Sequence, residues 1–260
     1  KAAIEAFERA IQLNPEDGRV YLHLGNAYLE TSKLEAAAQA CQKAVELLPD
    51  FAEAYATLGR VLHRQGELQA ATTEYQHAIR LDGEIAAYHY DLGSVYHSLG
   101  RLEEAEKEYQ ATLRLAPKMA SVYHNLGEIY QDQGKLDEAI RAYQQSLELS
   151  PEDKYTKARL TQTEQKRKKR LEQEILRYQT AISLRPNAPQ NYRQLALAYY
   201  NNRQLEEAIE SLRIALYLQP DSEQARYDVE SVLQQKETSL NTVLEGYLAQ
   251  GREQPENPDV

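Results

Sequence analysis

Tyr55-Ala-Thr-Leu-Gly-Arg-Val-Leu62 is the stretch that decides the fold, because its pattern returns at a fixed distance along the chain. Its Leu-Gly pair recurs with a spacing of 34 residues as Leu24-Gly25, Leu58-Gly59, Leu92-Gly93 and Leu126-Gly127. A period of this length indicates a helix–turn–helix unit that stacks on copies of itself. Stacked arrays present extended concave surfaces that serve for binding.

Further positions keep the same period. An aromatic residue stands three positions before each Leu-Gly pair, at Tyr21, Tyr55, His89 and Tyr123. Another series stands three positions after the glycine, at Tyr28, Leu62, Tyr96 and Tyr130. An alanine and then a larger residue follow, at Ala37/Cys41, Ala71/Tyr75, Ala105/Tyr109 and Ala139/Tyr143. The units end near Pro49, Gly83, Pro117 and Pro151, so four consecutive copies share one register.

The spacing inside each unit is helical. Tyr55, Leu58 and Leu62 lie at i, i+3 and i+7, which places them on one face of a first helix. Residues 68–78 repeat such a face and predict a second helix. Gly66 lies between the two faces, where a turn or helix C-cap tolerates positive φ.

The glycine after each leucine has a packing role. Gly59 and Ala71 lack bulk where the paired helices are expected to approach each other closely. A larger side chain there would separate the helices.

These motifs resemble the tetratricopeptide repeat (TPR) family, in the form found in bacterial arrays. Its signature is Tyr-x-x-Leu-Gly-x-x-Tyr, then Ala-x-x-x-Tyr, then Pro, here with Tyr in the place of the more usual Trp and Phe. The resemblance implies an all-α fold, an α-solenoid of stacked antiparallel helix pairs forming a right-handed superhelix. It also implies that the first helix of each pair lines the inner groove.

The pattern divides the chain. Residues 1–153 are predicted to form an N-terminal array of a half repeat and four full repeats. Residues 154–170 are a degenerate polar and basic helical connector, after which the signature returns one residue late. Residues 171–250 form a C-terminal block in which 222–250 is expected to be a capping helix pair, since terminal repeats are atypical. Residues 251–260 are expected to be a disordered tail.

The chain begins inside a predicted helix. Ile4, Phe7 and Ile11 form an apolar face that lacks the partner helix seen in the other units. We therefore expect further residues upstream of Lys1.

Composition narrows the class of partner. The net charge is −10, with 40 acidic and 30 basic side chains, which does not favour affinity for nucleic-acid backbones. We therefore expect a protein or peptide partner and no nucleic acid. The sequence contains no apolar run of about 18 residues, so no membrane span is predicted in this segment. The single cysteine, Cys41, rules out an internal disulfide framework and fits a cytoplasmic, reducing location.

Five consecutive basic residues, Lys166, Arg167, Lys168, Lys169 and Arg170, stand in the connector. One interpretation is an electrostatic patch for an acidic partner, RNA or a membrane surface. The other is a solvated helix face beside acidic neighbours such as Glu164 and Glu172. Both remain open on the sequence.

The resemblance also implies where a ligand would bind, on defined positions of each first helix. These positions are varied and polar, which suits an extended peptide or a partner's helix. They are His23, Asn26, Thr57, Arg60, Arg64, Tyr90, Asp91, Ser94, His97, His124, Asn125, Glu128, Arg193, Gln194, Tyr200 and Asn201.

One specialisation of the family is absent. Chaperone-tail binders hold a terminal carboxylate with Lys and Asn on one first helix, Asn on the next, and Lys and Arg on the third. Here Asn26 fits, but Leu22, Thr57, Ala87 and Asp91 occupy the other places. An aspartate would repel the carboxylate. Starting one unit later also fails.

The repeat arm of O-linked N-acetylglucosamine transferases is not matched either. Those arms repeat an asparagine on successive first helices. The corresponding series here is His23, Thr57, Asp91 and Asn125, with one match.

No motif for catalysis or for a cofactor is present, such as a Gly-rich phosphate loop, HExxH or a nucleophile elbow. His63, His97 and His124 lie near one groove, but no acidic ligand set accompanies them, so we expect no metal. We therefore expect no enzyme but a protein-interaction scaffold, adaptor or assembly factor that binds a peptide or partner helix. The alternative is the non-catalytic, recruiting arm of a larger enzyme, such as a glycosyltransferase or kinase. Homo-oligomerisation through end repeats is a third option.

Overall fold

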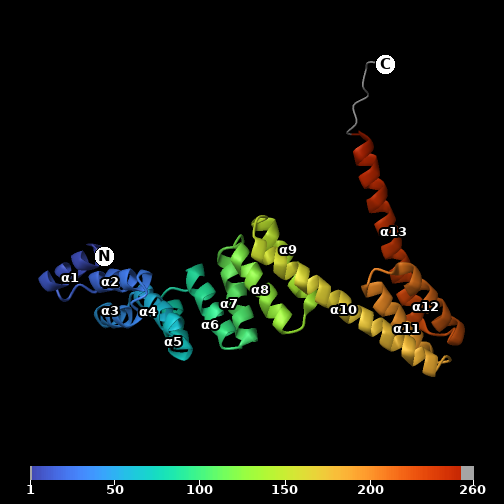
Figure 1. Ribbon diagram of the computed structural model, residues 1–260, viewed down its shortest axis with the longest axis horizontal. Helices are drawn as coiled ribbons and strands as arrows, with labels where there is room; N and C mark the ends of the chain where they lie inside the picture. The colour runs from blue at the N-terminus through green and yellow to red at the C-terminus, as the bar shows by residue number, and fades with distance from the viewer. Residues whose placement is uncertain (1, 253–260) are drawn as a thin grey trace, which may run out of the picture. The chain divides into compact units, whose positions relative to one another are not determined.

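The computed structural model describes residues 2–252, with side chains described as far as residue 238. This range contains thirteen helices and no strand (Figure 1). The chain forms two compact units, with the boundary between Thr163 and Glu164, and each is described by itself. The helices of the first unit are α1 (Ala2–Leu13), α2 (Gly18–Glu30), α3 (Leu34–Leu47), α4 (Ala52–Gln65), α5 (Leu68–Leu81), α6 (Ala86–Ser98), α7 (Leu102–Leu115), α8 (Ala120–Asp132) and α9 (Leu136–Leu149).

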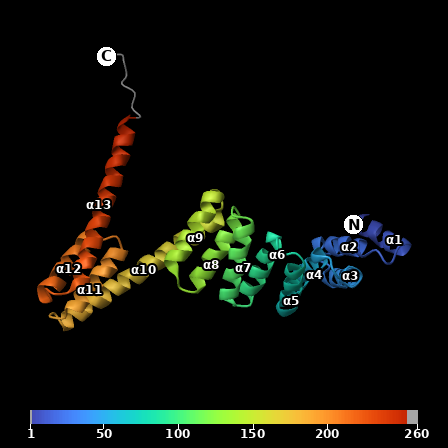
Figure 2. The same cartoon turned by 180° about the vertical axis from the view of Figure 1, so that it is seen from behind.

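The first unit is a stack of helix pairs. α2 packs on α3, α4 on α5, α6 on α7 and α8 on α9, and α3, α5 and α7 also pack on the first helix that follows each of them. Figures 1 and 2 show these helices side by side in chain order. α1 covers α2, as expected for the second half of a preceding repeat. The predicted all-α solenoid of stacked pairs is confirmed.

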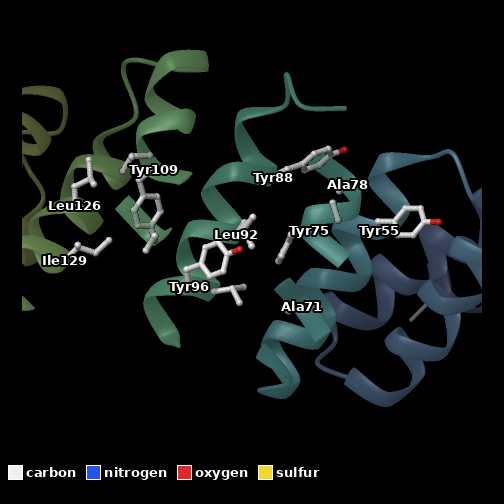
Figure 3. Packing of buried hydrophobic residues seen from close by; sticks show 14 of the residues in the cluster. Tyr55, Ala71, Tyr75, Ala78, Tyr88, Leu92, Tyr96, Tyr109, Leu126 and Ile129 are labelled. Carbon is white, nitrogen blue, oxygen red and sulfur yellow. The ribbon is translucent and has the colours of Figure 1, made fainter. Parts of the chain in front are cut away.

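A contact between glycine and tyrosine holds each pair at close range. A Cβ atom added to Gly93 would lie 2.8 Å from the ring of Tyr109, and one added to Gly127 would lie 2.5 Å from the ring of Tyr143. The corresponding distance from Gly59 to Tyr75 is 3.1 Å. Tyr75 and Tyr109 belong to one continuous core with Leu92 and Leu126 (Figure 3), and all three tyrosines are fully buried. In the first pair Cys41 takes the place of the ring against Gly25.

The turn inside each pair needs a left-handed residue. Gly66, Gly100 and Gly134 occupy this position with φ of 83°, 71° and 74°. This φ costs glycine little because it has no Cβ. Ser32 and Arg203 fill the same place in two other pairs with φ of 57° and 61°, at a cost of about 1 kcal/mol each.

α10 (Lys154–Leu184) is one continuous helix of 31 residues. It contains both the polar connector and the helix expected around Tyr178, because no glycine or proline interrupts the segment. Its first half occupies the place of a first helix beside α8, but its buried side chains are polar. Thr156 and Thr163 are fully buried, whereas Tyr155 is 57% exposed.

The second unit contains one further pair, α11 (Pro189–Asn201) and α12 (Leu205–Leu218), which is followed by α13 (Glu223–Arg252). Ala196 takes the place of the glycine and packs with Leu212 and Val232 in a small core. The capping pair expected for 222–250 is instead a single helix, because no turn signal separates two helical faces there. The expected tail at 251–260 lies, from residue 253 onwards, outside the described residues.

Substituting the core glycines should destabilise the fold in a graded way. Alanine in a helix interior normally stabilises by about 0.5–1 kcal/mol relative to glycine. Gly127→Ala and Gly93→Ala should instead lower the free energy of unfolding by about 1–3 kcal/mol, because the added methyl would collide with a buried ring. Gly59→Ala should cost less. Thermal unfolding followed by circular dichroism measures the series.

The matched control combines Gly127→Ala with Tyr143→Leu, which reproduces the Ala196 and Leu212 pair of the second unit. This double variant should regain part of the lost stability. Equal stability of Gly127→Ala and the wild-type chain would contradict the packing argument.

Candidate binding face on the first helices

The predicted binding residues lie on α2, α4, α6 and α8 in the first unit and on α11 in the second. His23, Arg60, Arg64 and Asn201 are exposed, and most of the others are half-buried. Thr57 and His124 are buried, with exposures of 2% and 9%, and therefore support the fold from within. The exposed and half-buried members of this set that belong to the first unit are called the first-helix face.

Neighbouring first helices are joined through this face. A guanidinium nitrogen of Arg60 on α4 lies 3.6 Å from Asp91 on α6. Both groups lie near the hydroxyl of the buried Tyr75. Burial raises the pKa of the Asp91 carboxyl, and Arg60 partly offsets that effect. The pair therefore joins two repeats above a core tyrosine.

The contact between α6 and α8 on this face is made by uncharged side chains. The side-chain amide of Asn125 on α8 donates to the hydroxyls of Tyr109 at 3.1 Å and of Tyr90 at 3.4 Å. The rings of Tyr90 and Tyr109 lie 5.8 Å apart. Asn125 therefore ties a core tyrosine to a residue of the face.

Two further contacts join the C-terminal ends of neighbouring first helices. Arg64 donates to the carbonyl of Leu29 at 3.0 Å, which completes the last turn of α2. His97 lies 3.4 Å from Asp132 on α8. Sequence reasoning selected Arg64 and His97 but not the two groups that they contact.

A polar cluster joins α8 to the first half of α10. His124 Nδ1 lies 2.7 Å from the Thr156 hydroxyl, and Arg159 donates to the Glu128 carboxylate at 2.9 Å. His124 and Arg159 hold the pKa of Glu128 at about 2. Thr163 donates to Gln131 at 2.8 Å. Hydrogen bonds and charge therefore replace the apolar contacts of earlier repeats.

The second unit carries the predicted residues of α11, which are described separately. Arg193 on α11 donates to Asp228 on α13 at 2.5 Å, and Asp228 is only 7% exposed. Tyr200 packs beside the small core, and the carbonyl of Asn201 accepts from Arg167 at 3.1 Å. Gln194 is half-buried on the same helix.

Other residues of the first-helix face are aromatic or uncharged polar side chains. His23 stacks on Phe7 of α1 with ring centroids 5.8 Å apart. Asn26 and Ser94 are half-buried on α2 and α6. Together with Arg60 and Tyr90, they leave donors and aromatic surface within reach of solvent.

The basic run lies on the part of α10 that belongs to the second unit. Lys166, Lys168 and Lys169 are exposed. Lys168 pairs with Glu172 at 4.0 Å and Arg170 with Glu174 at 3.6 Å, both one turn along the helix. Such exposed pairs contribute little stability. This geometry supports the solvated-face interpretation at least as well as the electrostatic site.

The candidate metal ligands and the single thiol have the following surroundings. Among the residues that the structure describes, no group of three His, Cys, Asp or Glu side chains could hold a metal ion. Cys41 is fully buried, and burial raises the pKa of its thiol to about 12. A thiol in that state is a core residue.

The partners that sequence reasoning missed have a recognisable spacing. Asp132, Thr156, Arg159 and Asp228 each lie 31 to 35 positions from the residue that they contact. A search for complementary polar residues about one repeat apart would have included them among many candidate pairs, without showing which pairs meet.

Comparison with known proteins places the chain in a family. A family model described as "Cilia and flagella-associated protein 70 C-terminal domain" matches residues 1–181, and a tetratricopeptide repeat model matches residues 189–222. The chain belongs to the tetratricopeptide repeat family. The first model matches more than half of the chain, so this TPR chain also belongs to the domain family that this model describes. No curated protein matches it significantly by sequence.

Solved structures agree on the fold. A crystal structure of MamA is 31% identical with a TM-score of 0.55, and the match covers 57% of this chain and 86% of that one. TTC0263, a TPR protein of Thermus thermophilus, is 27% identical with a TM-score of 0.51, covering 62% and 88%. YrrB, titled "a TPR protein with an unusual peptide-binding site", is 23% identical with a TM-score of 0.51, covering 86% and 97%. Over the described residues, no helix is both long enough and apolar enough to cross a bilayer.

Removing the charge of Glu128 should loosen the contact between α8 and α10 in a pH-dependent way. The folded-state pKa of about 2 lies below the ordinary value of 4.5, so this carboxylate stabilises the fold above pH 4.5, and the gain disappears as pH falls towards 2. Glu128→Gln should therefore cost about 1–2 kcal/mol at pH 7, after allowance for solvent screening.

The difference between wild type and Glu128→Gln should shrink between pH 5 and pH 2, as measured by urea unfolding at each pH. Glu103→Gln, on the exposed side of α7, is the matched control and should change stability by less than about 0.5 kcal/mol. A difference that is constant with pH would contradict the assignment.

Proposed function

We propose that this TPR chain is a protein-interaction scaffold or adaptor that binds an extended peptide or a partner's helix on its first-helix face. The observation that carries the proposal is the contrast between the core and this face. Tyr75, Tyr109 and Tyr143 pack in the same way in their repeats, whereas the residues of the first-helix face differ from repeat to repeat. Variation on a fixed frame supplies a distinct set of donors and acceptors for a ligand.

The chemistry of the face indicates the kind of ligand. Arg60, with a side chain 45% exposed, and the half-buried Tyr90 offer a cation and an aromatic hydroxyl on successive helices. Arg60 is already paired with Asp91, so a ligand carboxylate would compete with an existing contact. We therefore propose a ligand of mixed polarity, held by many moderate contacts along the helices.

We also propose that this segment is not itself catalytic and that it works in the cytoplasm. In the described part of the chain its ionisable groups mostly form contacts between repeats, as in Arg193 with Asp228 and in the cluster of Glu128 with Arg159. The net charge of −10 is consistent with a protein partner in preference to nucleic acid. Cys41, a buried thiol, fits a reducing compartment.

Affinity capture with mass spectrometry tests the first-helix face. The variant Arg60→Ala/Tyr90→Ala/His97→Ala should lose its captured partners by at least about tenfold, since each change removes an exposed or half-buried contact group. Asn125 is left intact because it holds the core Tyr109.

The matched control is Glu103→Ala/Lys107→Ala/Arg114→Ala, which alters exposed residues of the second helix α7. Thermal unfolding of both triple variants shows that each remains folded. Partners retained by the first variant and lost by the control would place the site on the second helices instead.

A further inference from the structure

A tyrosine closes the space between successive second helices in most repeats. The Tyr28 hydroxyl donates to Glu8 at 2.7 Å, and Gln76 donates to the Tyr96 hydroxyl at 2.8 Å. The Tyr130 hydroxyl donates to Glu106 at 3.0 Å. In each case the ring comes from a first helix and its polar partner from the preceding second helix. Tyr96, labelled in Figure 3, is only 5% exposed.

A cation covers each of these rings. Lys33 lies 5.5 Å from the ring of Tyr28, and Arg101 lies 4.6 Å from the ring of Tyr96. Lys135 lies 5.8 Å from the ring of Tyr130. The cation always stands five residues after the tyrosine. Ring and cation therefore form a repeated plug, stabilised by cation–π attraction.

The repeat of α4 and α5 lacks both parts of this plug. Leu62 stands where the other repeats have tyrosine, and Glu67 stands where they have lysine or arginine. Gln42 occupies the position of Glu8 and Gln76, and no hydrogen bond reaches its side chain among the described residues. The acceptor and the space for a ring are therefore present without the ring.

A groove of about 570 Å³ lies at this place, between α3 and α5 and above α4. Leu58 and Leu62 give it apolar surface, and its polar lining includes Gln42, Glu46 and Glu74. The volume falls in the range of small-ligand sites. Because all of these residues belong to the first unit, the groove is defined within one compact body.

The charged side chains that line the groove are Lys43, Glu46 and Glu74, so its net charge is negative. Glu46 is paired with Lys43 at 3.1 Å. Glu74 is half-buried and has no ion pair or hydrogen bond within the described part of the chain. Burial raises the pKa of its carboxyl, and His77 partly offsets this. Together with Glu67, it replaces the positive charge that covers the ring in the other repeats.

We propose that this groove binds a tyrosine side chain of a partner polypeptide, with an adjacent arginine or lysine of that partner facing Glu74 and Glu67. The partner supplies in trans the ring and the cation that Tyr96 and Arg101 supply in cis. The ring packs on Leu58 and Leu62, and its hydroxyl bonds to the Gln42 amide. This site is separate from the first-helix face and does not depend on it.

The test uses the whole chain, labelled with ¹⁵N, and the blocked peptide acetyl-Ala-Tyr-Arg-Ala-amide as the probe. Amide shifts should change at Gln42, Leu62 and Glu74 on titration. The peptide acetyl-Ala-Leu-Glu-Ala-amide is the matched control and should give at least about tenfold weaker binding, since it lacks both ring and cation. Equal shifts with both peptides would overturn the proposal.

Restoring the plug supplies the decisive variant. Leu62→Tyr/Glu67→Arg reproduces Tyr96 with Arg101, so it should raise the melting temperature by about 2–4 °C and abolish the peptide-induced shifts. Glu74→Gln should weaken binding of the tyrosine–arginine peptide by about five- to tenfold, because it removes one half-buried ion pair. Unchanged peptide shifts in the plugged variant would overturn the assignment.

The reciprocal variant Tyr96→Leu/Arg101→Glu should open an equivalent groove beside Gln76 and gain peptide-induced shifts there. If this variant unfolds, the plugged variant still decides the question, because it only introduces residue types that other repeats carry at the same two positions. Self-association that the plugged variant abolishes, as measured by light scattering, would identify a second copy as the occupant and overturn the partner proposal.

Discussion

The close contact between a helix glycine and a buried ring is the constraint on which the structure depends. Gly93 and Gly127 leave room for Tyr109 and Tyr143, and this proximity sets the distance between the two helices of a pair. Because the same contact returns every 34 residues, successive pairs have the same thickness and stack without a change of register. In the second unit Ala196 replaces the glycine and Leu212 replaces the tyrosine, so the combined side-chain volume of the two positions stays similar.

The buried rings also connect the core to the first-helix face. Tyr109 accepts a hydrogen bond from Asn125 of the next repeat, and Tyr75 lies beneath the pair formed by Arg60 and Asp91. Positions that vary between copies, and would therefore specify a ligand, are thus also contacts between repeats. A ligand that engages them must compete with these contacts, which favours binding through several moderate contacts.

Departures from the repeat are as informative as the repeat itself. Leu62 and Glu67 remove a ring and a cation together, and a groove with an acidic wall lies where they are missing. Thr156 and Thr163 replace apolar residues where α10 meets α8, and the contact becomes a hydrogen-bonded cluster. In both places the altered residues change the chemistry of an interface while the helices keep their pairing.

The sequence by itself determined the helix pairs, their order and the turn at Gly66, because period, helical spacing and turn chemistry are local properties of the chain. The tertiary structure alone decided which polar residues meet: Arg60 reaches Asp91, and His124 is buried against Thr156. Contacts between residues 31 to 35 positions apart exist only after neighbouring repeats have stacked, so no local pattern could specify them.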